Sequence, residues 1–326
     1  LLLSNMLINT LFGTAFFAGL VYALFVDFTY MKIYLALLIP YTIFTQIYMK
    51  FKIPQSKRKL TAIATWNHPT DPTVYLLSDY KIALAKAWVK ANNEKQTGEN
   101  AHITLTHYVA KALGLALHEG REDIGRIVFG YYHPADSIGI TVLCDREGKD
   151  LIPVTVWDCH KKTVEQIASE LNVKVGKAKT NKDKDFNEAT KLFKYIPTFI
   201  LQPLVHFAAY FAANLGIEIP GMGCKVERMG HVLLSNVGTM GIDYGFAPLC
   251  SPTFTQIVAC MGKISMKPLV SEETGEIKAE EVMSSVLTFD HRFGDGVQGS
   301  RIFKKFKQAL ENPDIINLAV PDDKKK

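Results

Sequence analysis

The stretch FDHRFGDG, residues 289–296, places ionisable side chains where an apolar run ends. Asp290, His291, Arg292 and Asp295 follow VMSSVLTF within six residues. Histidine titrates near neutral pH and is suited to general-base work. Glycines on both sides of Asp295 allow a tight turn that presents the imidazole at a sheet edge. A lone histidine is more often structural, but this clustering predicts a site of proton transfer with His291 as the base.

The elements that must position this site alternate between strand and helix patterns. β-Branched runs predict strands over 72–82, 137–144, 151–159, 231–238, 254–264 and 281–290, with a hairpin at DREGKD. Apolar residues at helical spacing predict helices over 105–119, 162–179 and 299–313, the last ending at Asn312-Pro313. Mixed strands and helices with hairpins favour an α+β fold over a doubly wound parallel sheet.

The first 50 residues are more apolar than the rest of the chain. Residues 6–26 contain no charge and are long enough to span a bilayer, and 33–49 are at the lower limit, with Pro40 inside. We interpret residues 1–50 as a transmembrane helical hairpin; one signal anchor followed by a buried helix is the alternative. The basic linker 51–59 places the following domain on the cytoplasmic or an equivalent side.

Residues 195–217 form a second apolar segment without acidic or basic residues other than His206. Pro197 and Pro203 argue against a simple spanning helix, and a span here would move the downstream chain across the membrane. One interpretation of this segment is a helix buried in the core. We expect instead an in-plane or re-entrant element that lies against the bilayer and contacts membrane lipid. It could alternatively cover a lipophilic channel.

Composition excludes several function classes. The chain has 326 residues, 48% of them hydrophobic, and a formal net charge of +5. This charge is mild, and no basic run interleaved with aromatic residues indicates nucleic-acid binding. Five scattered cysteines form no CxxC pair, so we expect neither a metal site nor a disulfide framework.

Several segments together resemble a known enzyme family. DHRxxDG followed by a helix ending in ENP is similar to the catalytic core of the dihydrolipoamide acyltransferases of 2-oxo-acid dehydrogenase complexes, whose fold chloramphenicol acetyltransferase shares. Residues 233–270, which begin LLSNVG, resemble the family's SNxG segment and the apolar strand after it. Residues 103–117 resemble its early helix, and residues 137–171 its paired strands and following helix. The resemblance spans roughly 57–313, with an insertion at about 195–230. It implies a chloramphenicol acetyltransferase-like mixed-sheet sandwich.

The resemblance also implies roles for five residues. His291 would remove a proton from the acceptor as it attacks a thioester carbonyl, and Ser235 would donate a hydrogen bond to the oxyanion. Asp295 would support the turn. Asn236 and Gly238 would shape the bend at Ser235 and line the substrate site.

The expected protein is a membrane-anchored, CoA-dependent acyltransferase that acts as a homotrimer. We expect the catalytic domain at 60–313 and a charged tail at 314–326. CoA or acyl-CoA is the expected substrate, the acceptor or acyl donor could be lipophilic, and no lipoyl domain precedes the catalytic domain in this sequence. The residues do not indicate where CoA binds, so the channel of the trimer would have to supply that site.

Two other interpretations remain open. A non-catalytic trimeric scaffold could have kept the fold, although the joint presence of His291, Ser235 and Asp295 favours an enzyme. WNHPTD, residues 66–71, is weakly similar to the HxxxxD site of glycerolipid acyltransferases, but His68 and Asp71 are only three apart. We therefore interpret that stretch as a turn.

Overall fold

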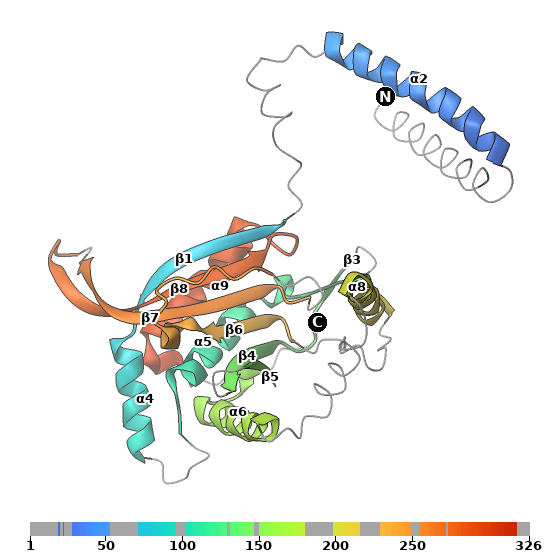
Figure 1. The fold of residues 1–326 in the computed structure, drawn as a ribbon. Coiled ribbons are helices and arrows are strands. Elements are labelled where there is room, and N and C mark those ends of the chain that lie inside the picture. Colours follow the sequence, from blue (N-terminus) through green and yellow to red (C-terminus); the bar gives the residue numbers. More distant parts are fainter. Residues whose placement is uncertain are drawn as a thin grey trace. The chain divides into compact units, whose positions relative to one another are not determined.

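A computed structural model describes residues 19, 22, 28–52, 71–95, 102–128, 131–146, 150–179, 198–215, 229–249, 254–271 and 273–317. Contacts within the chain divide it into two units, Leu1–Thr70 and Asp71–Lys326. In the first unit the structure describes one long helix, α2 (Phe28–Lys52), with Pro40 inside (Figure 1). The second unit contains the sheet and the motif (Figure 1).

The prediction of a transmembrane hairpin finds no support in the described residues. α2 covers the second predicted span, 33–49. The first, 6–26, lies almost wholly outside the described residues. Among the helices that the structure describes, none combines the length and the apolar character needed to cross a membrane.

The second unit is built on a six-stranded mixed sheet in the order β1-β8-β7-β6-β4-β5. Its strands are β1 (Thr73–Lys81), β4 (Gly139–Arg146), β5 (Asp150–Trp157), β6 (Val232–Asn236), β7 (Ile257–Val270) and β8 (Ile277–Asp290). β6 is parallel to both β4 and β7, and the other pairs are antiparallel. A separate hairpin joins β2 (Gly125–Val128) to β3 (Tyr131–Pro134). The α+β expectation is confirmed.

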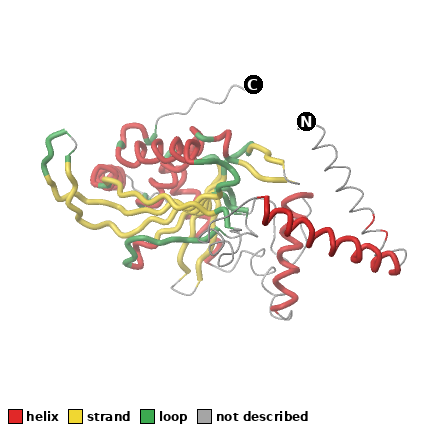
Figure 2. The backbone as a smooth tube through the Cα atoms, turned by 90° about the horizontal axis from the view of Figure 1, so that it is seen from above, coloured by secondary structure: helices red, strands yellow, loops and turns green. Residues whose placement is uncertain are grey.

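Helices pack on one face of this sheet and enclose the core (Figure 2). They are α4 (Ala83–Lys95), α5 (Leu105–Glu119), α6 (Val164–Lys179) and α9 (Gly296–Glu311). α5 lies at the centre, because eleven of its fifteen residues are buried and it contacts both α6 and α9. Short 3-10 turns complete this layer: η2 (Arg121–Asp123), η3 (Cys159–Lys161) and η6 (Pro313–Ile315).

The opposite face, which we call the open face, carries no long helix among the described residues of this unit. A loop over 237–249 crosses it, beginning with the 3-10 turn η4 (Val237–Met240). The loop contacts β7 closely, since a β-carbon on Gly262 would overlap the carbonyl of Asp243. Strand alternation therefore divides the side chains of the sheet between the helical layer and this loop.

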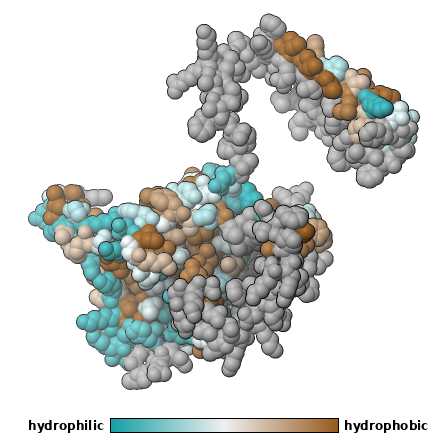
Figure 3. All heavy atoms as spheres, viewed as in Figure 1, coloured by the Kyte–Doolittle hydropathy of each residue, from teal (hydrophilic) through white to brown (hydrophobic). Residues whose placement is uncertain are grey.

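β7 and β8 continue beyond the sheet as a two-stranded arm. β6 pairs with β7 only as far as Met261, and β1 pairs with β8 only from Val282 onward. The strands pair further, to Val270 and Ile277, where both side chains are largely exposed. Apolar side chains are visible at the tip of the arm at the left of Figure 3, among hydrophilic ones.

The apolar segment at 195–217 contains the helix α8 (Thr198–Leu215), with Pro203 inside. It contacts β2 and buries a face of Ala208, Ala209 and Ala212. Phe207 and Tyr210 point outward and are 53% and 52% exposed. The segment is therefore not buried in the core on all sides, and its expected contact with lipid stays a prediction.

Candidate active site

His291 directly follows the last residue of β8. Its backbone N–H donates to the carbonyl oxygen of Pro72 at 2.8 Å, which fixes the start of the turn against the chain entering β1. The imidazole is exposed and its ring centroid lies 6.3 Å from that of Phe289. The turn thus presents the imidazole outward from the end of the strand, as the motif predicts.

The residues on either side of His291 form an ion pair that braces this turn. The Arg292 guanidinium donates from Nε to both oxygens of Asp290 at 3.0 Å and from one terminal nitrogen to Oδ2 at 2.5 Å. Asp290 is only 5% exposed, whereas the Arg292 side chain is 60% exposed. These hydrogen bonds to Asp290 raise the pKa of Arg292. The pair holds the backbone on both sides of His291.

Asp295 caps α9. Its Oδ1 accepts from the backbone N–H of Val297 at 2.7 Å, and the side chain of Gln298 accepts from the N–H of Asp295 at 3.0 Å. This reciprocal arrangement is a capping box. The cap determines where the helix begins and hence where the turn after His291 ends.

Ser235, the predicted oxyanion donor, lies near the end of β6. Val232 and Leu234 are fully buried under the helices, so the alternating side chain of Ser235 points to the open face. Asn236 points the other way and donates to Oγ1 of Thr106 on α5 at 3.3 Å. Gly238 contacts β7 so closely that a β-carbon would overlap the backbone of Gly262. These contacts fix the strand and the bend around Ser235.

Strand register keeps Ser235 and His291 apart within one chain. Ser235 pairs with Cys260 on β7, and Cys260 pairs with Val286 on β8. His291 is five residues beyond Val286, a distance of roughly 17 Å at ~3.4 Å per residue, and β8 is two strands away from β6. The fold therefore does not bring the two predicted catalytic side chains of one chain together.

The cavity behind the motif is smaller than a typical ligand pocket. It measures about 50 Å³, whereas pockets for ligands of drug size measure about 300–1,000 Å³. Its lining includes Leu117, Phe289, Phe293, Gly299 and Ile302. A substrate that reaches His291 must therefore approach its exposed side.

Three supporting contacts were not predicted from the sequence. They are the Asp290–Arg292 pair, the Pro72 carbonyl and the Thr106 hydroxyl. The adjacency of Asp290 and Arg292 was a usable signal, because an acid and an arginine two residues apart can pair across a turn. Pro72 and Thr106 are distant in sequence, and no local pattern indicates their contacts.

Comparison with known proteins finds similarity to one enzyme family over the segment that contains this site. Residues 227–318, which include Ser235 and the whole His291 motif, match the model of the family "2-oxoacid dehydrogenases acyltransferase (catalytic domain)". The dihydrolipoyllysine-residue acetyltransferase component of the pyruvate dehydrogenase complex of Staphylococcus aureus is 27% identical over 272 residues. That alignment covers 81% of this chain and 52% of the relative, so the chain spans about half the length of the curated relatives it matches.

Solved structures share the fold. The cubic core of a pyruvate dehydrogenase multienzyme complex superposes with a TM-score of 0.57 and 15% identity, over 76% of this chain and 85% of the other. The dihydrolipoamide acetyltransferase of Azotobacter vinelandii gives 0.56 and 16% identity over the same shares of the two chains. That structure addresses the catalytic role of a serine, a histidine and an asparagine, the last two being four residues apart. The mixed α+β sheet fold and the resemblance to the acyltransferase catalytic core are confirmed, whereas the membrane anchor stays a prediction.

Proposed function

We propose that this chain, whose residues 227–318 match the model of the 2-oxoacid dehydrogenases acyltransferase (catalytic domain) family, transfers an acyl group from a CoA thioester to an acceptor nucleophile. His291 of one chain and Ser235 of a neighbouring copy form each active site. The chain then acts as a homotrimer with three equivalent sites.

The proposed reaction needs one base and one oxyanion donor. The His291 imidazole takes the proton of the acceptor hydroxyl or thiol as that group attacks the thioester carbonyl. The Ser235 hydroxyl donates a hydrogen bond to the oxyanion of the tetrahedral intermediate. When the intermediate collapses, the C–S bond breaks and the CoA sulfur takes the proton from the imidazolium. The base is thereby returned to its neutral form.

The observation that carries this proposal is the separation of Ser235 and His291 by the strand register. The two side chains lie at different levels of the sheet and on strands that are not neighbours. A head-to-tail contact between copies can bring the His291 end of one sheet to the open face of the next. Head-to-tail contacts form a ring when the rotation between copies closes, as a homotrimer requires.

The open face near Ser235 offers a suitable surface for a second copy. Large apolar side chains of β1 and of the 237–249 loop are exposed there: Tyr75, Leu77, Met240, Ile242, Tyr244 and Phe246. Clustered exposed apolar residues are typical of interaction sites. The likeness to the cubic core of a multienzyme complex supports assembly of this fold from several copies.

The Azotobacter vinelandii enzyme supports the choice of residues. Its serine, histidine and asparagine correspond in type and order to Ser235, His291 and Asp295, apart from aspartate in place of asparagine. The histidine and the residue four positions later keep the same spacing in both chains. We do not assign the acceptor of that enzyme to this chain.

Complementation between variants tests the shared site directly. His291→Ala should lower kcat by about two to four orders of magnitude, and Ser235→Ala by about two to three, because a base and an oxyanion donor contribute on that scale. Co-expression of the two variants in equal amounts should restore activity, since about one contact in four joins an intact His291 to an intact Ser235. The assay follows CoA release from acetyl-, succinyl- and long-chain acyl-CoA thioesters with thiol and alcohol acceptors.

The outcomes separate the alternatives. If each site lay within one chain, mixing the variants would restore nothing. A parent chain that turns over none of these thioesters would favour the non-catalytic scaffold. Native mass spectrometry that found an active monomer would contradict the homotrimer.

A further inference from the structure

A polar cluster on the open face joins three strands to the loop that follows Ser235. Nζ of Lys267, on the arm, donates to Oδ1 and Oδ2 of Asp79 on β1, both at 2.9 Å. It also donates to Oγ of Ser284 on β8 at 2.8 Å and to the hydroxyl of Tyr244 at 2.9 Å. Tyr244 belongs to the 237–249 loop and its hydroxyl donates to Oδ1 of Asp79 at 3.0 Å. One ammonium therefore has four oxygen neighbours.

The cluster is partly shielded from water. The side chains of Lys267 and Asp79 are 25% and 33% exposed, and Ser284 is fully buried. Burial acts to raise the pKa of Asp79, but hydrogen bonds from Lys267, Ser284 and Tyr244 outweigh it and lower that pKa. The Lys267 ammonium also lies 5.0 Å from the centroid of the Tyr244 ring. A charged group with this many partners holds its neighbours more firmly than an exposed ion pair does.

Beyond its first turn the loop is attached to the sheet at several described points, among them a hydrogen bond from the backbone of Ala247 to the Cys260 thiol. Near Ser235, η4 contacts the Gly262 region of β7, and the Lys263 N–H donates to the carbonyl of Ile242 at 2.8 Å. Further along, Tyr244 binds the cluster and the ring of Phe246 lies 5.3 Å from that of Tyr75, edge to face. Among the described loop residues, Tyr244 is the one whose side chain hydrogen-bonds to Lys267 and Asp79.

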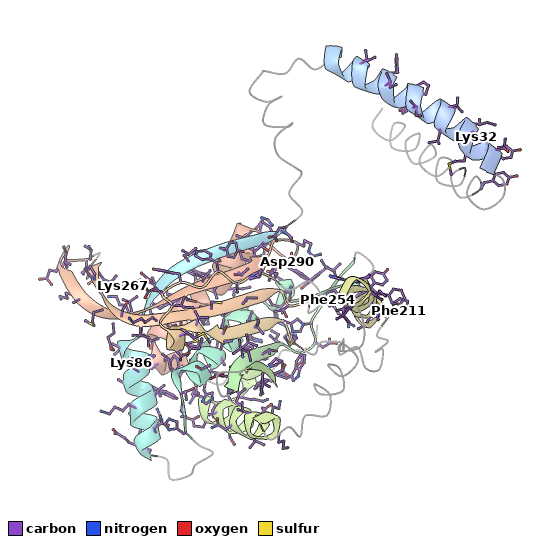
Figure 4. The ribbon with its side chains drawn as sticks, viewed as in Figure 1. Lys32, Lys86, Phe211, Phe254, Lys267 and Asp290 are labelled. Carbon is purple, nitrogen blue, oxygen red and sulfur yellow. The ribbon has the colours of Figure 1, made fainter. Side chains whose placement is uncertain are left out.

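We infer that Lys267 is a positioning residue: with Asp79 it clamps Tyr244 and so fixes the loop that sets the orientation of Ser235. The inference rests on the proposed function, because it assigns the clamp a role in oxyanion stabilisation. Lys267 does not contact the reacting atoms. It lies toward the opposite end of the sheet from Asp290, the neighbour of His291 (Figure 4).

The clamp explains a polar cluster that the sheet itself does not require. β1 pairs with β8 along its whole length, and β7 pairs with β8 on both sides of a register shift between Met261 and Ile264, so the strands are joined without the cluster. Apolar residues at the four positions would fill the same space at no cost in unpaired charge. What the polar cluster adds is a directional bond to one loop residue, Tyr244. A small displacement of the loop matters, because an oxyanion donor acts only within hydrogen-bond distance of the oxyanion.

Two substitutions remove the clamp in different ways. Lys267→Met removes the ammonium and keeps an unbranched side chain, and Tyr244→Phe removes only the hydroxyl. Lys278→Met is the matched control, because Lys278 is on the same arm and pairs at 2.9 Å with the exposed Glu276, away from the loop. All three are made in the full chain.

The first measurement is hydrogen exchange of the amides of residues 237–249. We expect Lys267→Met and Tyr244→Phe to speed this exchange by about tenfold, because local opening loses one charged anchor. Lys278→Met should leave it unchanged, and the α5 amides should exchange at parent rates in all variants. Unchanged loop exchange in Lys267→Met would overturn the clamp whether or not the protein is an enzyme.

The second measurement is a double-mutant cycle with Ser235→Ala on thioester turnover. Lys267→Met alone should lower kcat about tenfold with KM near that of the parent, and should have no further effect once Ser235 is alanine. Effects on kcat that simply multiply would show that Lys267 acts elsewhere and would overturn the inference. A parent without turnover would contradict the proposed function, whereas the exchange rates decide the clamp separately.

Discussion

Asp295 stabilises the start of α9, and its proposed contribution to the site follows from that cap. Asp295→Ala removes an acceptor for the Val297 N–H, so we expect the free energy of unfolding to fall by about 1 kcal/mol. Asp295→Asn keeps a capping oxygen, so its free energy of unfolding should fall by much less. Urea denaturation of the three proteins measures both. Equal stability of parent and Asp295→Ala would contradict the capping role.

At this scale the residue types were predictable and their contacts only in part. The DHR sequence put Asp290, His291 and Arg292 side by side, and the turn follows from the glycines around Asp295. The contacts of Asn236 with Thr106 and of Lys267 with Asp79 join residues more than one hundred positions apart. Such pairs depend on which strands and helices become neighbours, and no local pattern encodes that.

Close contact between η4 and β7 makes Gly238 sensitive to substitution. A β-carbon there would overlap the carbonyl of Gly262, so Gly238→Ala should cost about 1–3 kcal/mol of stability and displace Ser235. Gly296→Ala is the matched control, since a β-carbon at the first position of α9 has open space around it. Thermal unfolding and turnover of both variants test this. A stable, fully active Gly238→Ala protein would show that η4 can shift without consequence.

The sequence predicted helices and strands best where they have a buried face, and less well where they are exposed. α5 has the predicted bounds, 105–119, because its apolar residues recur with the helical period and face the core. β7 and β8 are longer than predicted, since their ends form the arm, where burial no longer imposes an alternating pattern. The sequence analysis did not predict α4, whose only fully buried residue is Ala85.

Acidification should weaken the whole second unit through three buried histidines, His107, His160 and His231. Burial lowers the pKa of each to about 4. In the unfolded chain they titrate near 6.5, so between these values the unfolded chain binds more protons. The free energy of unfolding is therefore fully present above pH ~6.5 and falls as the pH drops toward ~4, by at most about 3 kcal/mol per histidine.

Urea denaturation at pH ~7 and pH ~5 measures this loss. A variant with His160→Gln should lose less stability between the two pH values than the parent does. His133→Gln is the control, because His133 is exposed. Parent stability that does not change between the two pH values would contradict the expectation.

For the whole molecule, the resemblance predicted the fold class, which solved structures share, and the similarity to the family whose model matches residues 227–318. It did not predict the register that separates Ser235 from His291, because pairing of β6, β7 and β8 is a tertiary property. The membrane hairpin depends on residues 6–26, almost all outside the described part, and it stays a prediction together with the location of the protein.

The separation of Ser235 from His291 within one chain has a consequence for when the molecule becomes active. Under the proposed function, a single newly synthesised chain folds into a complete sheet and yet has no working site. Activity then appears with a delay that shortens as the local concentration of chains rises, because formation of each site is an encounter between copies. Until that encounter, an isolated imidazole without an oxyanion donor does not consume cellular thioesters. Strong dilution should return the enzyme to this latent state with its fold intact.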